Sequence, residues 1–523
     1  MSEFAINYFR RPKSFGDSIR GKTKKEWTWD EITSKVKYTD KPINHSLLRL
    51  ESNEADKMAQ DTFLCIMRFM GDEALKRGQT YTDCVYELLS VCHRYPPLRD
   101  EVYCQIIKQV TSNRSANADS LIKGWRLFGI LTAYFDSSEM LKPYLMRYLS
   151  DIAIDSRRAY TGSAKICLDN LKHTFQFGGR KFILSASEVE AITMGKSVKR
   201  QAYHLPGGHK KLISTKSVTV AEEIVQELCL EMNIRGTAEQ HEFCLCYILE
   251  KNGSIKILNN DEYIMDVTTE LDVANEEYVL LLTRSVWISP LRADSPLYID
   301  VLFFQTVPNY VAGFLNILPK EQLTAALLDD TAIFGALLLL SDPYNRDEIL
   351  TSEIVQNLIP KSILKRSTIT LEQWVGRVEN KTRLLPHNID HMEARRMFLE
   401  KLEKWPLFGA SFFFVKRVNA EKVQLLEAIV AINKHGIRVL TSDTHEAVLH
   451  HTLNEIETTN QYKTSTGNYI DIRLNPNKDN REVISLETEN GGEIARVVAH
   501  YTYLVKEKDS FYALDRAIAS SEL

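Results

Sequence analysis

The first third of the chain repeats apolar residues with a helical period. Residues 103–110 place Tyr, Ile, Ile and Val at the i, i+3, i+4 and i+7 positions that share one face of an α-helix, and residues 59–70 and 141–148 repeat the pattern. Such apolar faces are buried when the helices pack against one another. The pattern therefore predicts a helical bundle over 45–195, with residues 1–44 packed on it as an N-terminal extension.

The period changes near residue 199. Two β-type runs flank a Leu-Pro-Gly-Gly turn, which is typical of a β-hairpin. Thr219 and Glu222 then have the spacing of a capping box ahead of an amphipathic helix. Further β-type runs lie at 243–249, 254–258 and 278–283. Hairpin, helix and more strands in this order predict a ubiquitin-like α+β lobe over 196–288.

Helical signals return after a Ser-Pro linker. Residues 321–340 are apolar nearly all round, which predicts a buried central helix, and residues 393–404 have the pattern of a final helix. The dipeptide Trp405-Pro406 ends that helix, because the residue before a proline disfavours the helical conformation. A helical lobe is therefore predicted over 289–404.

From residue 411 onward β-type runs dominate, until a last amphipathic helix is indicated at 492–506. Strands closed by one C-terminal helix predict a pleckstrin-homology-like β-sandwich over 405–507, followed by a tail at 508–523. The whole chain is thus expected to be multidomain, with four separately cored units end to end. Its 523 residues support this, since single domains usually hold about 100 to 200 residues.

Composition and charge narrow the class of protein. Hydrophobic residues at 44% suffice for sizeable cores. The net charge of −4 argues against a general nucleic-acid binder, whose affinity comes from clustered Lys and Arg. The charge is uneven, since residues 1–165 hold 26 Lys and Arg against 21 Asp and Glu, a net of +5, which leaves −9 for the rest. The N-terminal part therefore suits an acidic partner.

The cysteines and the apolar runs indicate a cytoplasmic protein. Most of the eight cysteines fall among apolar residues at helical spacing, as buried thiols do in a reducing compartment. The N-terminus lacks the apolar stretch of a signal peptide. The longest apolar run, 332–340, is far short of the roughly 20 residues that span a bilayer.

Several short motifs carry a family resemblance. They are RDEVYCQI at 99–106 with KQVT at 108–111, FMGD at 69–72, GWRL at 124–127, VLFFQ at 301–305 and WPLFG at 405–409. With the order of units, they resemble the tandem of a myosin tail homology 4 (MyTH4) domain and a three-lobed FERM module found in unconventional myosins of classes VII, X and XV. The resemblance spans about residues 10 to 507. No motor ATPase, light-chain-binding helix or coiled coil precedes the tandem, so the chain is expected to be a fragment of a longer motor protein.

The resemblance implies a non-catalytic tail module that links a motor to adhesion receptors, membrane-associated cargo or microtubules. It implies that the module needs no cofactor. It also implies a location at the cytoskeleton, the cell cortex or filopodia, and a part in actin-based motility. The tail of a kinesin with the same tandem and a FERM-type linker to membrane lipids remain as alternatives. The net −9 after residue 165 weakens the lipid alternative, because phosphoinositide headgroups need a basic cleft.

Patterns that carry catalytic or metal chemistry fail on inspection. Gly195-Lys196-Ser197 is similar to the end of a phosphate-binding loop, but Glu190 occupies the place of the first glycine. His445, His450 and His451 lack the i, i+4 spacing by which two ligands on a helix hold zinc. The histidine and two cysteines of residues 241–246 are better explained as part of a strand with a buried apolar row. The sequence thus predicts neither an enzyme nor a metal site.

Basic residues gather in the N-terminal part. Either they lie on a solvated surface, or they form the microtubule-binding face that the resemblance implies, since tubulin is acidic. The candidate residues for an acidic partner are Lys22, Lys24, Lys25, Lys76, Arg77, Lys108, Arg114 and Lys123.

The last helix holds the candidate cargo site. In pleckstrin-homology-like sandwiches an extended peptide adds to an exposed strand beside this helix. The apolar residues of this helix could line such a groove or could be buried in the core of the sandwich, and the sequence leaves both possibilities open. The predicted cargo-binding residues are Ile494, Val497, Val498, Tyr501, Arg496 and His500.

Lys478 and Arg481 lie three residues apart, just before a predicted strand. The resemblance to class VII tails implies that they fold back onto the motor domain and inhibit it. An ordinary exposed loop is the plainer explanation.

Overall fold

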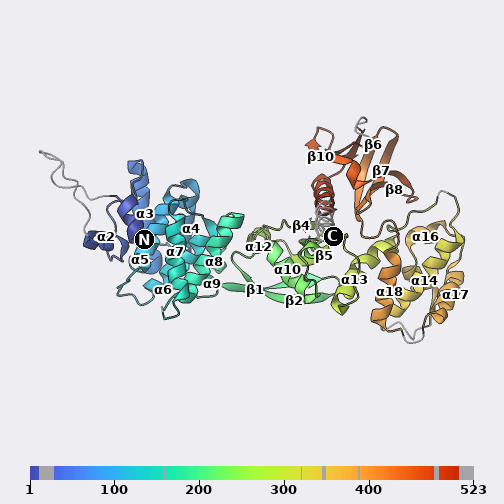
Figure 1. Ribbon diagram of the computed structural model, residues 1–523, viewed down its shortest axis with the longest axis horizontal. Helices are drawn as coiled ribbons and strands as arrows, with labels where there is room; N and C mark the ends of the chain where they lie inside the picture. The colour runs from blue at the N-terminus through green and yellow to red at the C-terminus, as the bar shows by residue number, and fades with distance from the viewer. Residues whose placement is uncertain are drawn as a thin grey trace, which may run out of the picture.

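The computed structural model describes residues 1–10, 29–157, 159–319, 321–343, 349–386, 389–475 and 482–505. The molecule is elongated, with a helical bundle at one end, a sheet-containing lobe in the middle, and a helical lobe and a β-sandwich side by side at the other end (Figure 1). We call these the bundle (residues up to 193), lobe one (198–284), lobe two (296–402) and lobe three (411–505).

The bundle is built from amphipathic helices around one core. The longest of them, α3, starts where the Ser52 hydroxyl accepts a hydrogen bond from the Ala55 amide, and it ends at Gly71 in the left-handed conformation. The short α1 packs Phe4 into this core, as expected for an N-terminal extension. The helices are α1 (Ser2–Tyr8), α2 (Trp29–Val36), α3 (Asn53–Met70), α4 (Tyr81–Arg94), α5 (Leu98–Val110), α6 (Ser120–Tyr134), α7 (Lys142–Ile154), α8 (Thr161–Phe177) and α9 (Ala186–Thr193).

Lobe one is a five-stranded sheet in the order β2-β1-β5-β3-β4, with α10 packed against it. The predicted hairpin is present as β1 and β2. The predicted capping box is wrong by one residue: the Thr219 hydroxyl accepts from the Lys216 amide, and Glu223 accepts from the Val220 amide. The elements are β1 (Val198–Leu205), β2 (His209–Lys216), α10 (Ala221–Glu231), α11 (Thr237–Gln240), β3 (Phe243–Leu249), β4 (Ile255–Ile257), α12 (Ile264–Val273) and β5 (Tyr278–Arg284).

Lobe two is helical, and its central helix is α14. This helix starts four residues later than predicted, because the Thr324 hydroxyl accepts from the Leu327 amide and so sets the N-terminus. Most of its second half is buried, as an apolar sequence all round requires. The helices are α13 (Pro296–Ala312), α14 (Ala325–Ser341), α15 (Ser352–Leu358), α16 (Lys361–Arg366), α17 (Leu371–Leu384) and α18 (His391–Leu402).

Lobe three is a sheet in the order β10-β11-β12-β6-β7-β8-β9, closed by a helix over 491–505. In Figure 1 this helix stands between the strands of lobe three and lobe one. The strands β9 and β10 were not predicted from the sequence. The strands are β6 (Ser411–Ala420), β7 (Val423–Asn433), β8 (Gly436–Thr441), β9 (Ala447–His451), β10 (Ile456–Lys463), β11 (Asn468–Leu474) and β12 (Glu482–Glu487).

The units are not separately cored, which corrects the expectation from the sequence. One apolar cluster runs from Leu228 of lobe one through Tyr298 to Phe398 of lobe two. The core of the bundle likewise includes Val220 and Tyr263 from lobe one. Shared cores join neighbouring units, so the surfaces of different lobes keep their positions relative to one another.

Candidate protein-binding site

Strand β10 (Ile456–Lys463) is an edge of the lobe three sheet, since within the described part of the chain it pairs with β11 alone. Its residues are mostly exposed. An edge strand has unpaired N–H and C=O groups, which a second extended chain can satisfy by adding as a further strand. Strand β10 therefore offers a place where a partner peptide could pair.

The apolar stripe of the helix over 491–505 faces inward. Ile494, Val497, Val498 and Tyr501 are between 0% and 4% exposed and belong to the core of lobe three. The sequence left open whether these four side chains line a groove or belong to the core, and the structure places them in the core. Their low exposure makes them core residues, and Val497 in addition lines a cavity shared with lobe one.

Arg496 and His500 lie on the shoulder of the helix that faces lobe one. Arg496 lines a cavity of about 710 Å³ together with Ile255 of lobe one. Its guanidinium donates to Glu493, and its buried Nη2 atom has no hydrogen-bond partner among the described residues. Burial lowers the pKa of His500, which lies against the backbone of His241. The prediction that these two side chains line a groove beside an edge strand is therefore corrected.

The opposite shoulder faces β10. Successive residues of an α-helix turn by about 100°, so Gly491, Ala495 and Ala499 lie together on that side. Gly491 and Gly492 pack beside Gln461 of β10, and Ala499 is exposed. Because these residues have little or no side chain, this side of the helix holds no bulky group beside the edge strand, and we take the surface between the helix and β10 as the candidate groove.

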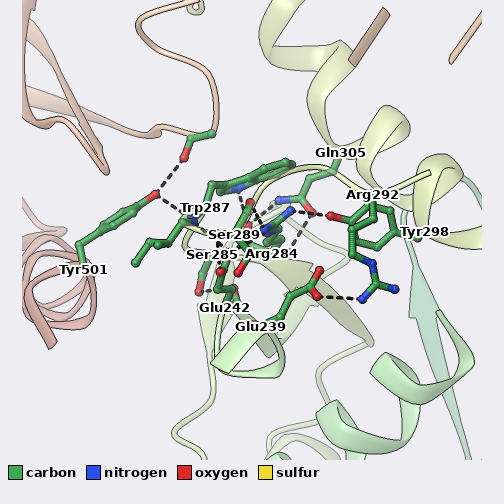
Figure 2. Close-up of polar contacts among 12 residues, drawn as sticks. Glu239, Glu242, Arg284, Ser285, Trp287, Ser289, Arg292, Tyr298, Gln305 and Tyr501 are labelled. Carbon is green, nitrogen blue, oxygen red and sulfur yellow. Dashed lines mark hydrogen bonds and ion pairs between the residues drawn. The ribbon is translucent and has the colours of Figure 1, made fainter. Parts of the chain in front are cut away.

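A buried ion pair fixes lobe one against the other two lobes (Figure 2). Arg284, at the end of β5, donates to Glu242 Oε2 through Nη2 at 2.6 Å and through Nε at 3.1 Å, and its Nη1 donates to the Tyr298 hydroxyl at 3.0 Å. The side chains of Arg284 and Glu242 are 0% and 2% exposed. Glu242 also accepts from the backbone amides of Ile288 and Ser289. The segment that leaves lobe one is therefore held by a charge-assisted network.

Tyr501 extends this network to lobe three. Its hydroxyl accepts from the Trp287 amide at 3.2 Å and donates to the Gly409 carbonyl at 3.1 Å, as Figure 2 shows in part. Gly409 has a φ of +66°, and a Cβ atom there would lie 2.5 Å from the Trp287 ring. The helix that borders the groove is thus attached directly to the junction of the lobes.

The bundle and lobe one are joined in a similar way. Arg180 is 1% exposed at its side chain and forms ion pairs with Glu188 at 2.6 Å and with Asp266 of lobe one at 2.8 Å. Tyr263 of lobe one donates to the Gly178 carbonyl at 2.6 Å. These contacts hold the two units in one orientation.

The predicted basic positions differ in what they offer a partner. Lys108 is buried at 4% exposure and donates to the Ser34 and Lys37 carbonyls, and burial lowers its pKa to about 8. It anchors the segment after α2, so its assignment to a binding face is corrected. Lys22, Lys24 and Lys25, and also Lys478 and Arg481, lie outside the described residues.

The remaining basic positions lie at one end of the bundle. Lys76, Arg77 and Arg114 are exposed, and Lys123 lies over the Tyr81 ring at 4.2 Å. They stand in or beside two loops, 71–80 and 111–119, which are tied together by a hydrogen bond from Asn117 to the Gly71 carbonyl. The loops also hold acids, so the surface is mixed in charge.

The rejected metal patterns have structural explanations. His445 is buried and its Nδ1 lies 2.8 Å from the Gly313 carbonyl of lobe two, whereas His450 and His451 belong to strand β9. Cys244 and Cys246 are both buried in β3. Within the described ranges no group of three or more His, Cys, Asp or Glu residues could hold a metal ion. Likewise, no helix described here has the length and apolar character to cross a bilayer.

Sequence reasoning missed the Glu242–Arg284 pair and the edge strand. The pair joins residues 42 positions apart, and each looked like ordinary surface charge. An available signal was the unusual order Arg-Ser-Val-Trp at 284–287, where a charge ends an apolar strand.

Comparisons with known proteins agree with this architecture. A family model described as the MyTH4 domain matches residues 85–191. Human unconventional myosin-XV is 33% identical over 509 residues, which are 95% of this chain and 14% of that protein. Human unconventional myosin-XVB is 33% identical over 422 residues, and Drosophila melanogaster myosin-VIIa is 24% identical over 480. The chain thus spans about a seventh of the myosin-XV relative.

Solved structures show the same fold. The C-terminal MyTH4–FERM domain of human myosin 7b, in complex with the harmonin-a PDZ3 domain, superposes with a TM-score of 0.68 at 19% identity over 96% of both chains. The MF1 MyTH4–FERM domain of Dictyostelium discoideum myosin VII gives 0.63 at 17% identity, again over 96% of both chains. The helical bundle followed by three lobes is therefore a MyTH4–FERM architecture.

Proposed function

The chain contains a MyTH4 domain and is homologous to the tails of unconventional myosins, and from this premise we propose that it is a non-catalytic module that binds cargo proteins. The proposed site is the groove between β10 and the helix over 491–505. The observation that carries it is that β10 is an edge strand packed beside Gly491 and Gly492 at the start of that helix. Ala495 and Ala499 follow on the same side by helical geometry.

The groove suits an extended peptide. The peptide backbone would pair with the free edge of β10, and every other side chain would point toward the helix shoulder. A glycine and two alanines leave space for those side chains. Cytoplasmic tails of adhesion receptors and membrane-associated proteins supply such segments. The complex of the myosin 7b tail with a PDZ domain supports protein binding as the class of function.

A substitution in the groove tests the proposal. Ala499 is exposed, so Ala499→Arg should fill the groove and leave the core intact. We expect it to abolish capture of a panel of fluorescent receptor-tail peptides. His500→Ala, on the opposite shoulder, is the matched control and should bind like the unaltered chain. Equal loss in both variants, or no loss in Ala499→Arg, would contradict the site.

We propose a second contact, with microtubules, for the exposed end of the bundle. Its support is the exposure of Lys76, Arg77 and Arg114 in loops tied to each other, which suits the acidic surface of tubulin. Charge reversal at Lys76, Arg77 and Lys123 should reduce microtubule co-sedimentation, and added salt should reduce it in the unaltered chain. Unchanged co-sedimentation would remove this contact.

Autoinhibition of the motor through Lys478 and Arg481 is proposed from the family resemblance alone. Removing both charges in the full motor should raise its basal ATPase rate, and an unchanged rate would exclude the contact. A location at the cortex or in filopodia follows from the same proposal, and a fluorescent fusion with the Ala499→Arg substitution should lose any enrichment there that depends on cargo.

A further inference from the structure

A cavity of about 170 Å³ lies where the bundle meets lobe one. Its walls come from α6, α8, α9 and the start of β1, and they are largely apolar: Trp125 and Ile130 are buried at the base, while Ile166 and Val198 are exposed at 41% and 47%. Exposed aliphatic side chains beside a cavity lower its affinity for water and favour an apolar occupant.

The size of the cavity selects the kind of occupant. It greatly exceeds the roughly 15 Å³ that hold one water molecule. It falls below the roughly 300 to 1,000 Å³ of pockets for drug-sized ligands and cofactors. One bulky apolar side chain is the occupant of matching size.

The charges around the cavity are mostly positive. Arg126, Lys196 and Lys216 line it, and Asp169 is the one acidic residue among the residues that line this cavity. Within the described part of the chain no ion pair involves these three cations. Arg126 is held in place by a hydrogen bond from Nη1 to the Ile192 carbonyl at 2.6 Å. Lys196 belongs to the Gly-Lys-Ser motif that failed as a phosphate-binding loop, and the structure places all three residues of that motif at the cavity.

We propose that this cavity binds a partner peptide in which a large apolar side chain is flanked by acidic residues. The apolar side chain enters the cavity, and the carboxylates face Arg126, Lys196 and Lys216. The inference deepens the proposed function, because it rests on the chain being a protein-binding module and adds a second peptide site far from the groove in lobe three.

The two units that form the cavity are joined by buried ion pairs. Arg180 and its ion pairs with Glu188 and Asp266 lie beside the cavity and join the bundle to lobe one. A preformed site avoids the free-energy cost of ordering two units around the peptide. Binding through one side chain and a few charges is then strong enough to measure.

The test uses the full chain with a fluorescent reporter at the mouth of the cavity. All eight cysteines are buried, so Met194→Cys, at a position that is 73% exposed, introduces the one accessible thiol for an environment-sensitive dye. The probe is a short synthetic peptide with a central Phe flanked by Asp and Glu. One control peptide has Ala for Phe, and another has Lys for the acidic residues.

We expect saturable binding of the acidic Phe peptide and at least tenfold weaker binding of both control peptides. Lys196→Ala and Lys216→Ala should each weaken binding by about two- to fivefold, as for exposed ion pairs, and Ile166→Asp by more than tenfold. Lys210→Ala, an exposed lysine at the other end of β2, should have no effect.

Two results would overturn the proposal: no saturable binding of the acidic Phe peptide, or equal binding of the Ala peptide, which would indicate an unspecific charge effect. Thermal unfolding of each variant verifies that it is folded. The Ala499→Arg substitution separates the two sites, because it should remove binding in the lobe three groove and leave the reporter signal at Met194→Cys unchanged.

Discussion

Replacing Arg284 by Met should loosen the junction of the three lobes. Methionine roughly keeps the volume but removes the donors to Glu242 Oε2, the Tyr298 hydroxyl and the Ser289 carbonyl. A carboxylate that is 2% exposed then remains without its cation. Breaking a buried ion pair in this way costs about 3–5 kcal/mol of stability, because the remaining charge is buried away from solvent and has lost its counter-charge.

The assay has to be local. The chain has several connected cores, so unfolding of the whole chain would not report on this junction alone. The amides of Ile288 and Ser289 donate to Glu242 and report on the junction directly. At about 1.4 kcal/mol for each factor of ten, a loss of about 3–5 kcal/mol should speed their hydrogen exchange by about two to three orders of magnitude or more.

A partly exposed ion-pair network on α18 supplies the control. Arg396 pairs with Glu393 and Glu400 at the surface, where such pairs contribute about 0–1 kcal/mol. Arg396→Met should therefore leave the exchange of the junction amides within about fivefold of the unaltered chain. If Arg284→Met also stays within that range, the pair does not hold the lobes together and the reasoning is refuted.

Three further changes test other parts of the structure. Gly409→Ala should lower the midpoint of thermal unfolding, because its φ is positive and the new Cβ would overlap Trp287. Burial raises the pKa of Glu101 to about 7, so its contribution to stability is present at acidic pH and is lost as pH rises toward 7; Glu101→Gln should flatten denaturation midpoints measured between pH 5 and 7. Lys108→Met should speed proteolysis after α2, since it removes the ammonium group that donates to the Ser34 and Lys37 carbonyls, and unchanged cleavage would contradict the anchor.

The parts of the fold with a strong local pattern could be predicted from the sequence. The β1–β2 hairpin follows from two β-type runs around a Pro-Gly-Gly turn, and α14 from a long apolar run. Their boundaries shifted where a single polar side chain decides the end, as at Thr324. Local chemistry of this kind needs no information about distant residues.

Features that depend on distant partners could not be predicted. Lys108 has the sequence of an exposed lysine near a helix end, but the carbonyls it binds come from residues 34 and 37. Strand β10 has exposed polar residues on both faces and therefore no alternation to detect. The two shoulders of the last helix differ in sequence, one with small residues and one with Arg496 and His500, but only the position of lobe one shows which of them faces β10.

The buried junctions also bear on how partners bind. Because Arg180 and Arg284 fix the bundle, lobe one and lobe three relative to one another, the lobe three groove and the cavity beside Trp125 are held at a constant separation. Consider a partner that carries both an extended segment and an acidic apolar motif. Once one of them is bound, the other meets its site at an effective concentration that is set by the partner's own linker, because the two sites do not move relative to each other. Arg284→Met should weaken such a two-site partner more than either isolated peptide, since it would let the separation vary. Equal weakening of all three ligands would mean that the two surfaces act independently.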